Sequence, residues 1–258
     1  MGQVISNCRH PERQPVILTL CDRQLTIDCL FHYNPKSLQP MPDSETCTTY
    51  ADLMEAGIRE NWTGTYLIDG LPGHEQSVEL TVIVQISRYE AIQARSQRHQ
   101  AFQSGMFSGI RAFVGRRRPV RIVVKKMLVM PAHVISPLYR RFWGIFKTGQ
   151  LESLGLNWSP VNPGRIIIPP YKQPWLVQSV VAHEAGHIFG IGDAYAAFYR
   201  FFSEAPGTRG FMMNSNQRVH PAEIAMMLTA HRLGRMQFFP KTWQPGVFFK
   251  RLFPMMFR

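Results

Sequence analysis

The chain has 258 residues, of which 45% are hydrophobic and 18% are charged, and its formal net charge is +12. These proportions are those of a globular protein with an ample core, and they exclude a disordered or fibrous chain. No apolar run approaches the roughly 18 residues that a membrane-spanning helix needs.

The first eight residues, MGQVISNC, fit the pattern for N-myristoylation, with Gly2 as the acceptor and Ser6 at the required spacing. Cys8 could take a second acyl chain. Because one myristoyl chain binds membranes only marginally, a second lipid or a basic patch would have to contribute. An anionic membrane surface is therefore one expected partner.

The first half of the chain predicts strands and one helix. Two short strands are expected within residues 15–33, on either side of the turn CDRQ. Apolar residues recur at helical spacing over residues 48–62, which predicts an amphipathic helix with a threonine cap. Residues 63–87 indicate two strands joined by a turn rich in Gly and Pro. The polar, basic residues 89–118 indicate a helix followed by a loop.

The second half adds two strands and up to three helices. Residues 120–130 are rich in β-branched side chains and predict a strand, and residues 135–146 indicate a short helix. A further strand is expected at 164–170, where prolines end it. Helices are expected over 175–189 and 221–236, the latter with a proline in its first turn.

Positive charge is unevenly distributed. Residues 91–151 hold twelve Lys and Arg and no acid, and no Asp or Glu occurs from Ile224 to the end. Such stretches favour binding to anionic surfaces, such as those of nucleic acid, acidic protein or lipid headgroups. The alternative interpretation is a basic face that contacts only solvent. The four cysteines, all before residue 48, show no disulfide-scaffold pattern, so free thiols are expected, although a Cys21–Cys29 bridge stays open.

One helix carries a candidate metal site. His183 and His187 lie one turn apart on the same face of the predicted helix, so both imidazoles can bind one ion. Glu184 lies beside the first histidine, as in the HExxH arrangement, in which the glutamate is a general base. Gly190 can end the helix in the left-handed conformation and let the chain bring Asp193 to the same ion. A buried helix with two satisfied histidines is the alternative.

HExxH alone arises by chance in roughly one chain of this length in a hundred or two, and requiring Gly190 and Asp193 as well lowers this frequency to a few in 100,000.

The stretch HEAGHIFGIGD resembles the extended zinc motif of the metzincin clan of metallopeptidases, in the variant with Asp as the third ligand. The later stretch RGFMMNSN resembles the Met-turn of that clan. Met213 is the best match and Met212 the alternative, and an ordinary core methionine is the other interpretation.

The resemblance implies an α+β fold of the metzincin-like zincin type. In this fold a mixed, twisted sheet packs on the active-site helix, and the C-terminal subdomain is mainly helical and irregular. The expected division is an N-terminal extension with short strands at 1–45, a metallopeptidase domain at 46–240 and a basic aromatic tail at 241–258. The motif similarity covers only about residues 164–230.

The resemblance also implies one Zn²⁺ per chain, held by His183, His187 and Asp193 with a position open for water. Glu184 would take the proton of that water and deliver it to the leaving amine. Tyr195 could donate a hydrogen bond to the developing oxyanion, or pack under the zinc loop instead.

Several alternatives remain open at this point. Glu204 or Glu223 could replace Asp193 as the third ligand, and His220 is expected in an exposed loop. An extended peptide substrate could pair with the strand at 120–130 or with the one at 164–170.

Two functions are compatible with these features. The first is a zinc-dependent endopeptidase acting on protein substrates in the cytoplasm, or in a host cytosol as a delivered effector or toxin, because no secretory signal is expected. The second is a basic membrane- or nucleic-acid-binding protein with a structural or vestigial zinc site. Nucleic acid is the less expected partner, and the sequence does not fix the oligomeric state.

Overall fold

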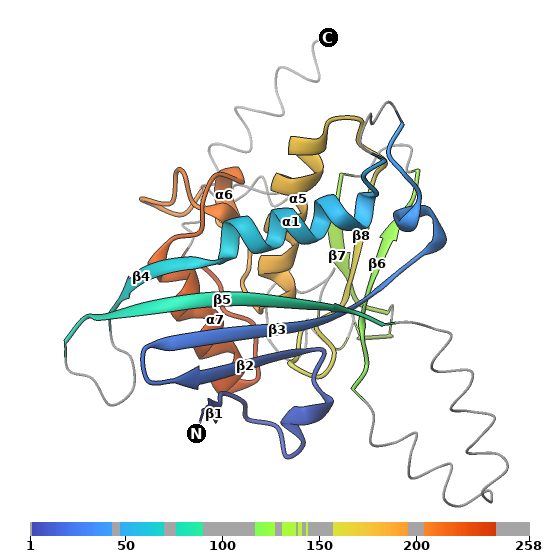
Figure 1. Ribbon diagram of the computed structural model, residues 1–258. Coiled ribbons are helices and arrows are strands. Elements are labelled where there is room, and N and C mark those ends of the chain that lie inside the picture. The colour runs from blue at the N-terminus through green and yellow to red at the C-terminus, as the bar shows by residue number, and fades with distance from the viewer. Residues whose placement is uncertain are drawn as a thin grey trace, which may run out of the picture.

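The computed structural model of the chain describes residues 2–42, 47–69, 76–89, 117–126, 131–137, 139–140, 143, 157–195 and 204–240 (Figure 1). Within these residues eight strands form one sheet: β1 (Gln3–Val4), β2 (Val16–Cys21), β3 (Gln24–Tyr33), β4 (Gly64–Ile68), β5 (Val78–Arg88), β6 (Val120–Val124), β7 (His133–Ile135) and β8 (Arg165–Ile168). The helices are α1 (Tyr50–Trp62), α5 (Pro174–Ile188), α6 (Met212–Ser215) and α7 (Pro221–Leu233), with single 3₁₀ turns η1 (Pro11–Arg13) and η2 (Pro35–Leu38).

Strand β3 is the centre of the sheet. It pairs antiparallel with β2 and parallel with β5, and its last three residues pair parallel with β6. Beyond β6 the order continues through β8 to β7, which is antiparallel to β8 and lies at the end of this path; on the other side, β4 flanks β5. The sheet is curled, so that β6, β7 and β8 stand upright at the right of Figure 1. The expected α+β class with a mixed sheet is therefore confirmed.

Most predicted elements have counterparts. The two strands within 15–33, the two within 63–87 and the helix at 48–62 are present, and the helices expected at 175–189 and 221–236 are α5 and α7. The strand predicted over 120–130 ends at Val124. The helix predicted over 135–146 is wrong at its start, because Ile135 belongs to β7, but Tyr139, Arg140 and Trp143 are helical. Half of that segment and most of 89–118 lie outside the described residues.

The segment 1–45 contributes β1, β2 and the central strand β3 to the sheet, while the tail at 241–258 lies outside the described residues. The four cysteines are free, as expected. Cys21 and Cys29 lie at opposite ends of the β2–β3 hairpin, where Cys21 faces Gln24 and Cys29 faces Val16, so no bridge joins them. Gly2 is exposed beside β1, and its acylation stays a prediction.

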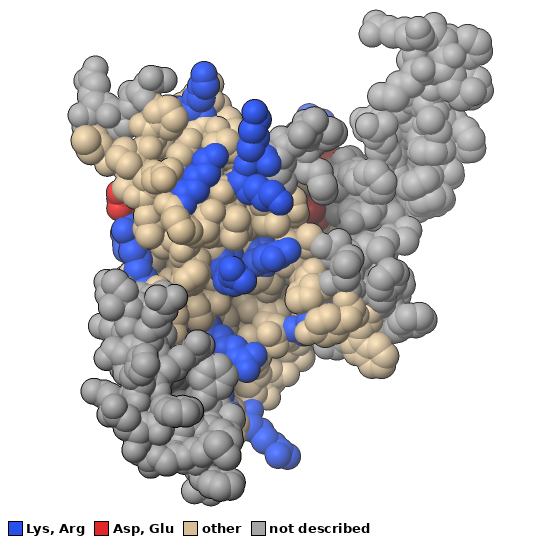
Figure 2. Space-filling view, turned by 90° about the vertical axis from the view of Figure 1, so that its right-hand side faces the viewer, with Lys and Arg blue, Asp and Glu red and all other residues tan. Residues whose placement is uncertain are grey.

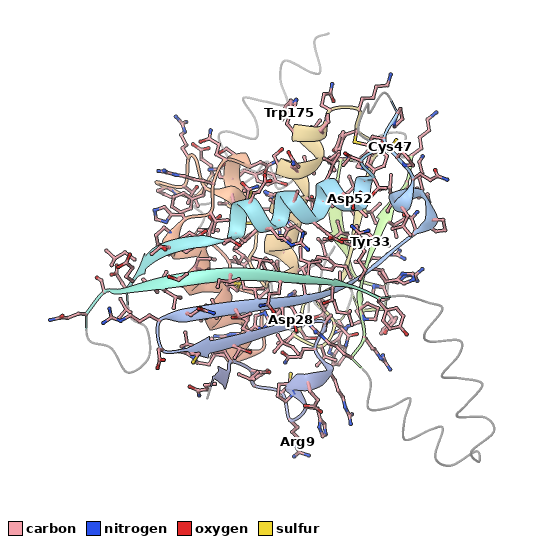
Figure 3. The ribbon with its side chains drawn as sticks, viewed as in Figure 1. Arg9, Asp28, Tyr33, Cys47, Asp52 and Trp175 are labelled. Atoms are coloured by element: carbon pink, nitrogen blue, oxygen red, sulfur yellow. The ribbon has the colours of Figure 1, made fainter. Side chains whose placement is uncertain are left out.

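Helix α1 begins with a capping box, in which Thr49 accepts a hydrogen bond from the backbone N–H of Asp52 and donates its own to the Asp52 carboxylate. Arg88 of β5 then binds Asp52 and Glu55, both at 2.6 Å, and ties α1 to the sheet. Figure 3 shows Asp52 and Tyr33 at this junction. The hydrogen bonds from Thr49 and Arg88 lower the pKa of Asp52 to about 2.

Helices α1 and α5 pack against each other at a glycine. A Cβ on Gly57 would lie 2.5 Å from the Cα of Gln178 and 2.8 Å from its carbonyl carbon, so the two backbones are in direct contact. Trp62, fully buried at the end of α1, donates its indole N–H to the carbonyl of Ala182 at 2.9 Å. This contact fixes the position of the helix that carries both histidines. None of the helices in the described part of the chain is long and apolar enough to cross a lipid bilayer.

Candidate metal centre

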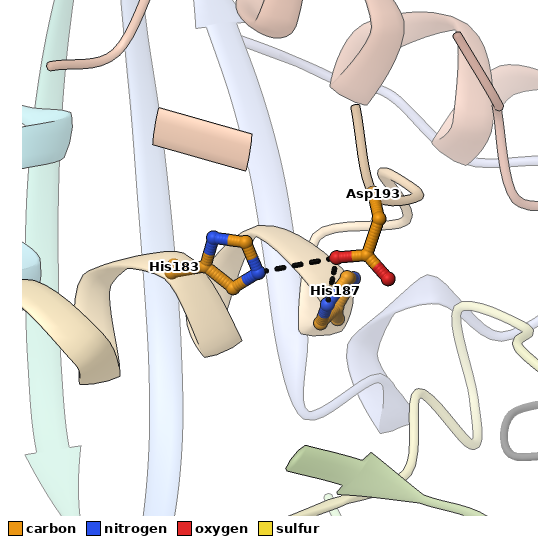
Figure 4. A group of neighbouring side chains, drawn as sticks. All are labelled: His183, His187 and Asp193. Atoms are coloured by element: carbon orange, nitrogen blue, oxygen red, sulfur yellow. Dashed lines mark hydrogen bonds and ion pairs between the residues drawn. The ribbon is translucent and has the colours of Figure 1, made fainter. Parts of the chain in front are cut away.

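Three side chains meet at the end of α5. The Nε2 atoms of His183 and His187 each lie 3.2 Å from the same carboxylate oxygen, Oδ1 of Asp193 (Figure 4). One potential ligand atom from each of the three residues lies within 4.8 Å of the other two. His183 is only 5% exposed, and the other two side chains are half-buried. The group is thus shielded on most sides but can be reached from solvent.

The other nitrogen of each ring is held by the backbone. Nδ1 of His183 lies 2.9 Å from the carbonyl oxygen of Met212, and Nδ1 of His187 lies 2.8 Å from that of Ile191. A carbonyl oxygen only accepts, so Nδ1 carries the proton and donates it in both contacts. Nε2, which faces Asp193, is the atom that can bind a metal when it carries no proton, and the ring orientation is fixed by the Nδ1 contacts.

The spacing of these atoms fits a tetrahedral ion. Zinc binds imidazole nitrogen and carboxylate oxygen at about 2.0–2.2 Å, so two ligand atoms of one tetrahedral site are about 3.3 Å apart. The two contacts of 3.2 Å match that value. Two imidazoles with one carboxylate are also a donor set that zinc accepts.

Electrostatics hold the three groups together. Burial alone would lower the pKa of His187, but the charge of Asp193 and its hydrogen bond outweigh burial and raise that pKa. Burial would conversely raise the pKa of Asp193, but the charge of His187 and the hydrogen bonds from both histidines lower it well below its usual range. Asp193 is therefore anionic at neutral pH.

The chain returns to the histidines through a glycine turn. Ile191 donates its N–H to the carbonyl of Gly186 at 3.0 Å and Gly190 donates to that of His187 at 3.1 Å, the two bonds of a Schellman motif. Gly190 has a φ of +94°, and a Cβ there would lie 2.7 Å from the Cβ of Ala230 and 2.8 Å from Trp158. Only glycine satisfies both the conformation and the space, and the turn brings Asp193 back to the helix.

Glu184 lies on α5 next to the first histidine and is 4% exposed. Its Oε2 atom is buried with no hydrogen-bond partner among the described residues. Burial raises the pKa of this carboxyl, against the opposing effect of the His187 and His183 charges. A buried carboxylate oxygen without a protein partner is free to accept a hydrogen bond from a water or a substrate.

The methionines of the predicted Met-turn lie beneath this helix. Met212 and Met213 begin α6 and are fully buried. The side chain of Met213 packs directly against Gly186, where a Cβ would displace the methionine sulfur. Met212 supplies the carbonyl that orients His183. The two methionines therefore have different roles, one of packing and one of hydrogen bonding.

Glu223 fixes this turn from the last helix. Its carboxylate is fully buried and accepts backbone N–H bonds from Met213 and His220, both at 2.7 Å, and from Met212 at 3.4 Å. Burial raises its pKa, and these three backbone donors partly offset the rise. Glu223 is thus engaged by the backbone of Met212 and Met213, and Glu204 by Arg209, so the structure gathers Asp193 with the histidines rather than either glutamate.

Sequence reasoning missed the role of Glu223, although one signal was present. A glutamate three residues after the cap is the second half of a capping box, and His220 occupies the cap position. Histidine is an uncommon cap, which conceals the pattern. His220, expected to be exposed, is instead half-buried and stacked on Phe211 with 3.9 Å between ring centroids.

Tyr195 lies beside the metal group. Its ring centroid is 5.8 Å from that of His183, and the residue is 37% exposed. The residue before it, Ala194, donates its N–H to the carbonyl of Met213 at 2.8 Å, which joins the loop after Asp193 to α6. This placement brings Tyr195 near the site without assigning it a catalytic role.

The edge of the sheet next to α5 is β7. Of the two strands expected to pair with a substrate peptide, β8 lies between β6 and β7, and β6 lies between β3 and β8. Neither has a free edge among the described strands, so that expectation is wrong. Three-residue β7, which the sequence did not predict, has an open outer edge within the described residues, as β1 and β4 also do, and β7 packs against α5.

Comparison of the chain with models of protein families, with curated proteins and with solved structures finds no significant match.

Proposed function

We propose that the protein is a zinc-dependent endopeptidase of the metzincin-like type, with one zinc ion per chain. The observation that carries the proposal is the approach of His183, His187 and Asp193 at ligand spacing, next to the buried carboxylate of Glu184. Structural zinc sites have four protein ligands, whereas catalytic sites have three and keep one position open. The described residues offer three. This count favours a catalytic centre over a structural one.

A zinc ion bound there supplies Lewis acidity, which polarises a peptide carbonyl and acidifies water. Glu184 acts as the general base that accepts a proton from the attacking water. Because burial raises the pKa of Glu184, its protonated form is less costly than that of an exposed carboxyl. Glu184 can therefore hold the proton and deliver it to the leaving amine.

The remaining residues of the site orient these groups. The carbonyls of Met212 and Ile191 hold the two imidazoles, and Asp193 contributes the anionic oxygen. The outer edge of β7 can take up an extended peptide as an added strand, with main-chain hydrogen bonds giving affinity. Since β7 packs against α5, a peptide bound there would lie near the metal centre.

Glu184→Gln tests the proposal. The amide keeps the size of the side chain but cannot accept a proton, so cleavage of a fluorogenic peptide library should fall roughly 100- to 10,000-fold, the usual contribution of a general base. Zinc content should stay near one per chain, because Glu184 is not a ligand.

The matched control is Glu60→Gln, the same substitution at an exposed position on α1, which should leave the rate unchanged. A wild-type protein that cleaves no peptide, or a Glu184→Gln variant as active as the wild type, would refute the endopeptidase proposal.

A further inference from the structure

Away from the metal ligands, the structure contains a cavity of about 360 Å³ lined by basic residues. It lies where the parallel strands β6 and β8 begin and where the antiparallel strand β7 ends. The described residues that line it include Arg118 and Arg121 at the start of β6, Arg165 at the start of β8, and Arg140 after β7. The cavity lies at the start of β8, whereas the chain continues from the end of β8 into α5, the helix that carries His183 and His187. The cavity and this helix, called the metal helix below, therefore lie at opposite ends of the strand.

The register of the strands brings two of these arginines together. Ile122 of β6 pairs with Ile166 of β8, and both are fully buried. Side chains alternate between the faces of a sheet, so the residues that precede them, Arg121 and Arg165, project together on the opposite face. Both are exposed. Like charges on neighbouring strands repel each other, which is unfavourable unless an anion lies between them.

No acidic side chain lines the cavity, and none of its four arginines forms an ion pair with a described residue. The adjacent Arg117 differs, since it binds the Asp28 carboxylate at 2.8 Å. Arg88 is likewise paired with Glu55 and Asp52. Figure 2 shows the side of the molecule that carries β6, β7 and β8, on which Lys and Arg gather while Asp and Glu are seen only at the margins.

We propose that this arginine cavity binds a small anion that carries more than one phosphate group. Guanidinium groups present paired N–H donors that match phosphate oxygens, and several arginines around one cavity suit a multiply charged ligand. The volume lies within the range of about 300–1,000 Å³ found for small-molecule sites. The ligand is either a free polyphosphorylated molecule or the phosphorylated headgroup of a lipid.

The test uses the full-length protein and two probes. Binding of inositol hexakisphosphate, measured by calorimetry, reports on a free anion. Sedimentation with phosphatidylcholine vesicles, with and without phosphatidylinositol bisphosphate, reports on a lipid headgroup. Binding to the soluble probe alone assigns a free ligand, and additional binding to the phosphoinositide vesicles assigns the headgroup.

The decisive comparison is between two double variants. Arg121→Gln with Arg165→Gln removes two charges from the cavity, whereas Arg232→Gln with Arg235→Gln removes two exposed charges at the end of α7. Loss of two charge-assisted contacts should weaken binding about tenfold or more in the first variant and less than about twofold in the second.

Neither variant should be less stable than the wild type in thermal unfolding, because all four arginines lie at the surface or at the cavity, and the cavity variant also loses the repulsion between Arg121 and Arg165. The proposal is wrong if the wild type binds neither probe, if the cavity variant binds as tightly as the wild type, or if both variants lose affinity equally. None of these substitutions touches the metal ligands or Glu184, so the outcome is independent of the endopeptidase proposal.

Discussion

Backbone carbonyls, rather than acidic side chains, orient the two histidines of α5. The carbonyl bound by His187 belongs to Ile191, directly after Gly190 in the turn, and that bound by His183 belongs to Met212. The geometry of the metal group therefore depends on the exact course of the backbone. Gly190 is the residue at which that course is most constrained, because its left-handed conformation and its contacts with Ala230 and Trp158 both exclude a side chain.

Gly190→Ala should accordingly destabilise the protein by about 2–4 kcal/mol, since the left-handed conformation and the lack of space both penalise a methyl group. Gly207→Ala is a matched control: Gly207 has a φ of +74°, but no described atom lies within 4 Å of a Cβ there. It should cost only about 1 kcal/mol. Urea unfolding measures both values, and equal losses would show that packing at Gly190 is unimportant.

His231 gives the protein a sensitivity to acid. It is fully buried against Trp158, both ring nitrogens lack a partner among the described residues, and burial lowers its pKa from 6.5 to about 3. Between these two values the unfolded chain binds a proton that the folded protein does not. The contribution of neutral His231 to the free energy of unfolding is therefore fully present above pH 6.5. As the pH is lowered from 6.5 toward 3, the free energy of unfolding falls by up to about 1.4 kcal/mol per pH unit.

His231→Phe should remove this contribution, because phenylalanine keeps the aromatic contact and does not titrate. The unfolding free energy, measured by urea between pH 4 and pH 7, should fall less steeply for the variant than for the wild type. The same substitution at exposed His10 is the control. Identical slopes for His231→Phe and the wild type would contradict the assignment.

The residues of the candidate metal site could be predicted from the sequence because they lie close together along the chain. His183, Glu184, His187 and Asp193 occur within eleven residues, and one helical period followed by one glycine turn relates their positions. Glu223 could not be assigned in this way. Its bonds to Met212 and Met213 depend on how α7 packs, which no local pattern encodes.

At the scale of elements, the metal helix is positioned by α1. The two backbones meet at Gly57 and Gln178, and Trp62 adds a hydrogen bond to Ala182. Close helix packing of this kind requires a residue without a side chain at the contact. Glycine in a helix interior is normally unfavourable by about 1 kcal/mol relative to alanine, so its presence here is explained by packing and not by helix propensity.

Gly57→Ala should reverse the usual effect of this substitution. Propensity alone predicts stabilisation by about 1 kcal/mol, but the contact with Gln178 predicts destabilisation by about 1–3 kcal/mol. Ala56→Gly, at the adjacent position of the same helix, should show the ordinary propensity cost of about 1 kcal/mol. Thermal unfolding of the two variants separates these effects, and a more stable Gly57→Ala protein would mean that the helices are not in contact there.

Long elements were easier to predict than short ones. Helices α1, α5 and α7 span 13 to 15 residues and show clear start signals, such as Thr49 before α1 and Pro221 in α7. Strand β7 has three residues, too few to show an alternation of apolar and polar side chains. The unpredicted element is nevertheless the sheet edge next to the metal helix.

At the scale of the whole molecule, the N-terminal segment 1–45 supplies strands to the same sheet on which α5, the helix with the two histidines, packs. Strand β3 pairs with three other strands and buries Leu25, Ile27, Cys29 and Phe31. Its position at the centre of the sheet could not be read from the sequence, because strand order depends on pairing between distant segments. The cavity formed by arginines from β6 and β8 depends on the same long-range pairing.

The loop that carries Asp193 is held by backbone hydrogen bonds. Gln237, after α7, donates its N–H to the carbonyl of Gly190 and accepts a hydrogen bond from Gly192, both at 2.8 Å. The loop is thus fixed between α5, α6 and the segment that follows α7. A metal site built in this way should be preformed, with Asp193 already oriented before an ion binds.

We propose that His183, His187 and Asp193 hold one zinc ion. Inductively coupled plasma mass spectrometry of the purified chain, after dialysis against metal-free buffer, tests it most directly. About one zinc per wild-type chain is predicted, with a large loss in Asp193→Ala. A wild-type chain that retains almost no zinc, or an Asp193→Ala chain that retains as much as the wild type, would contradict the account.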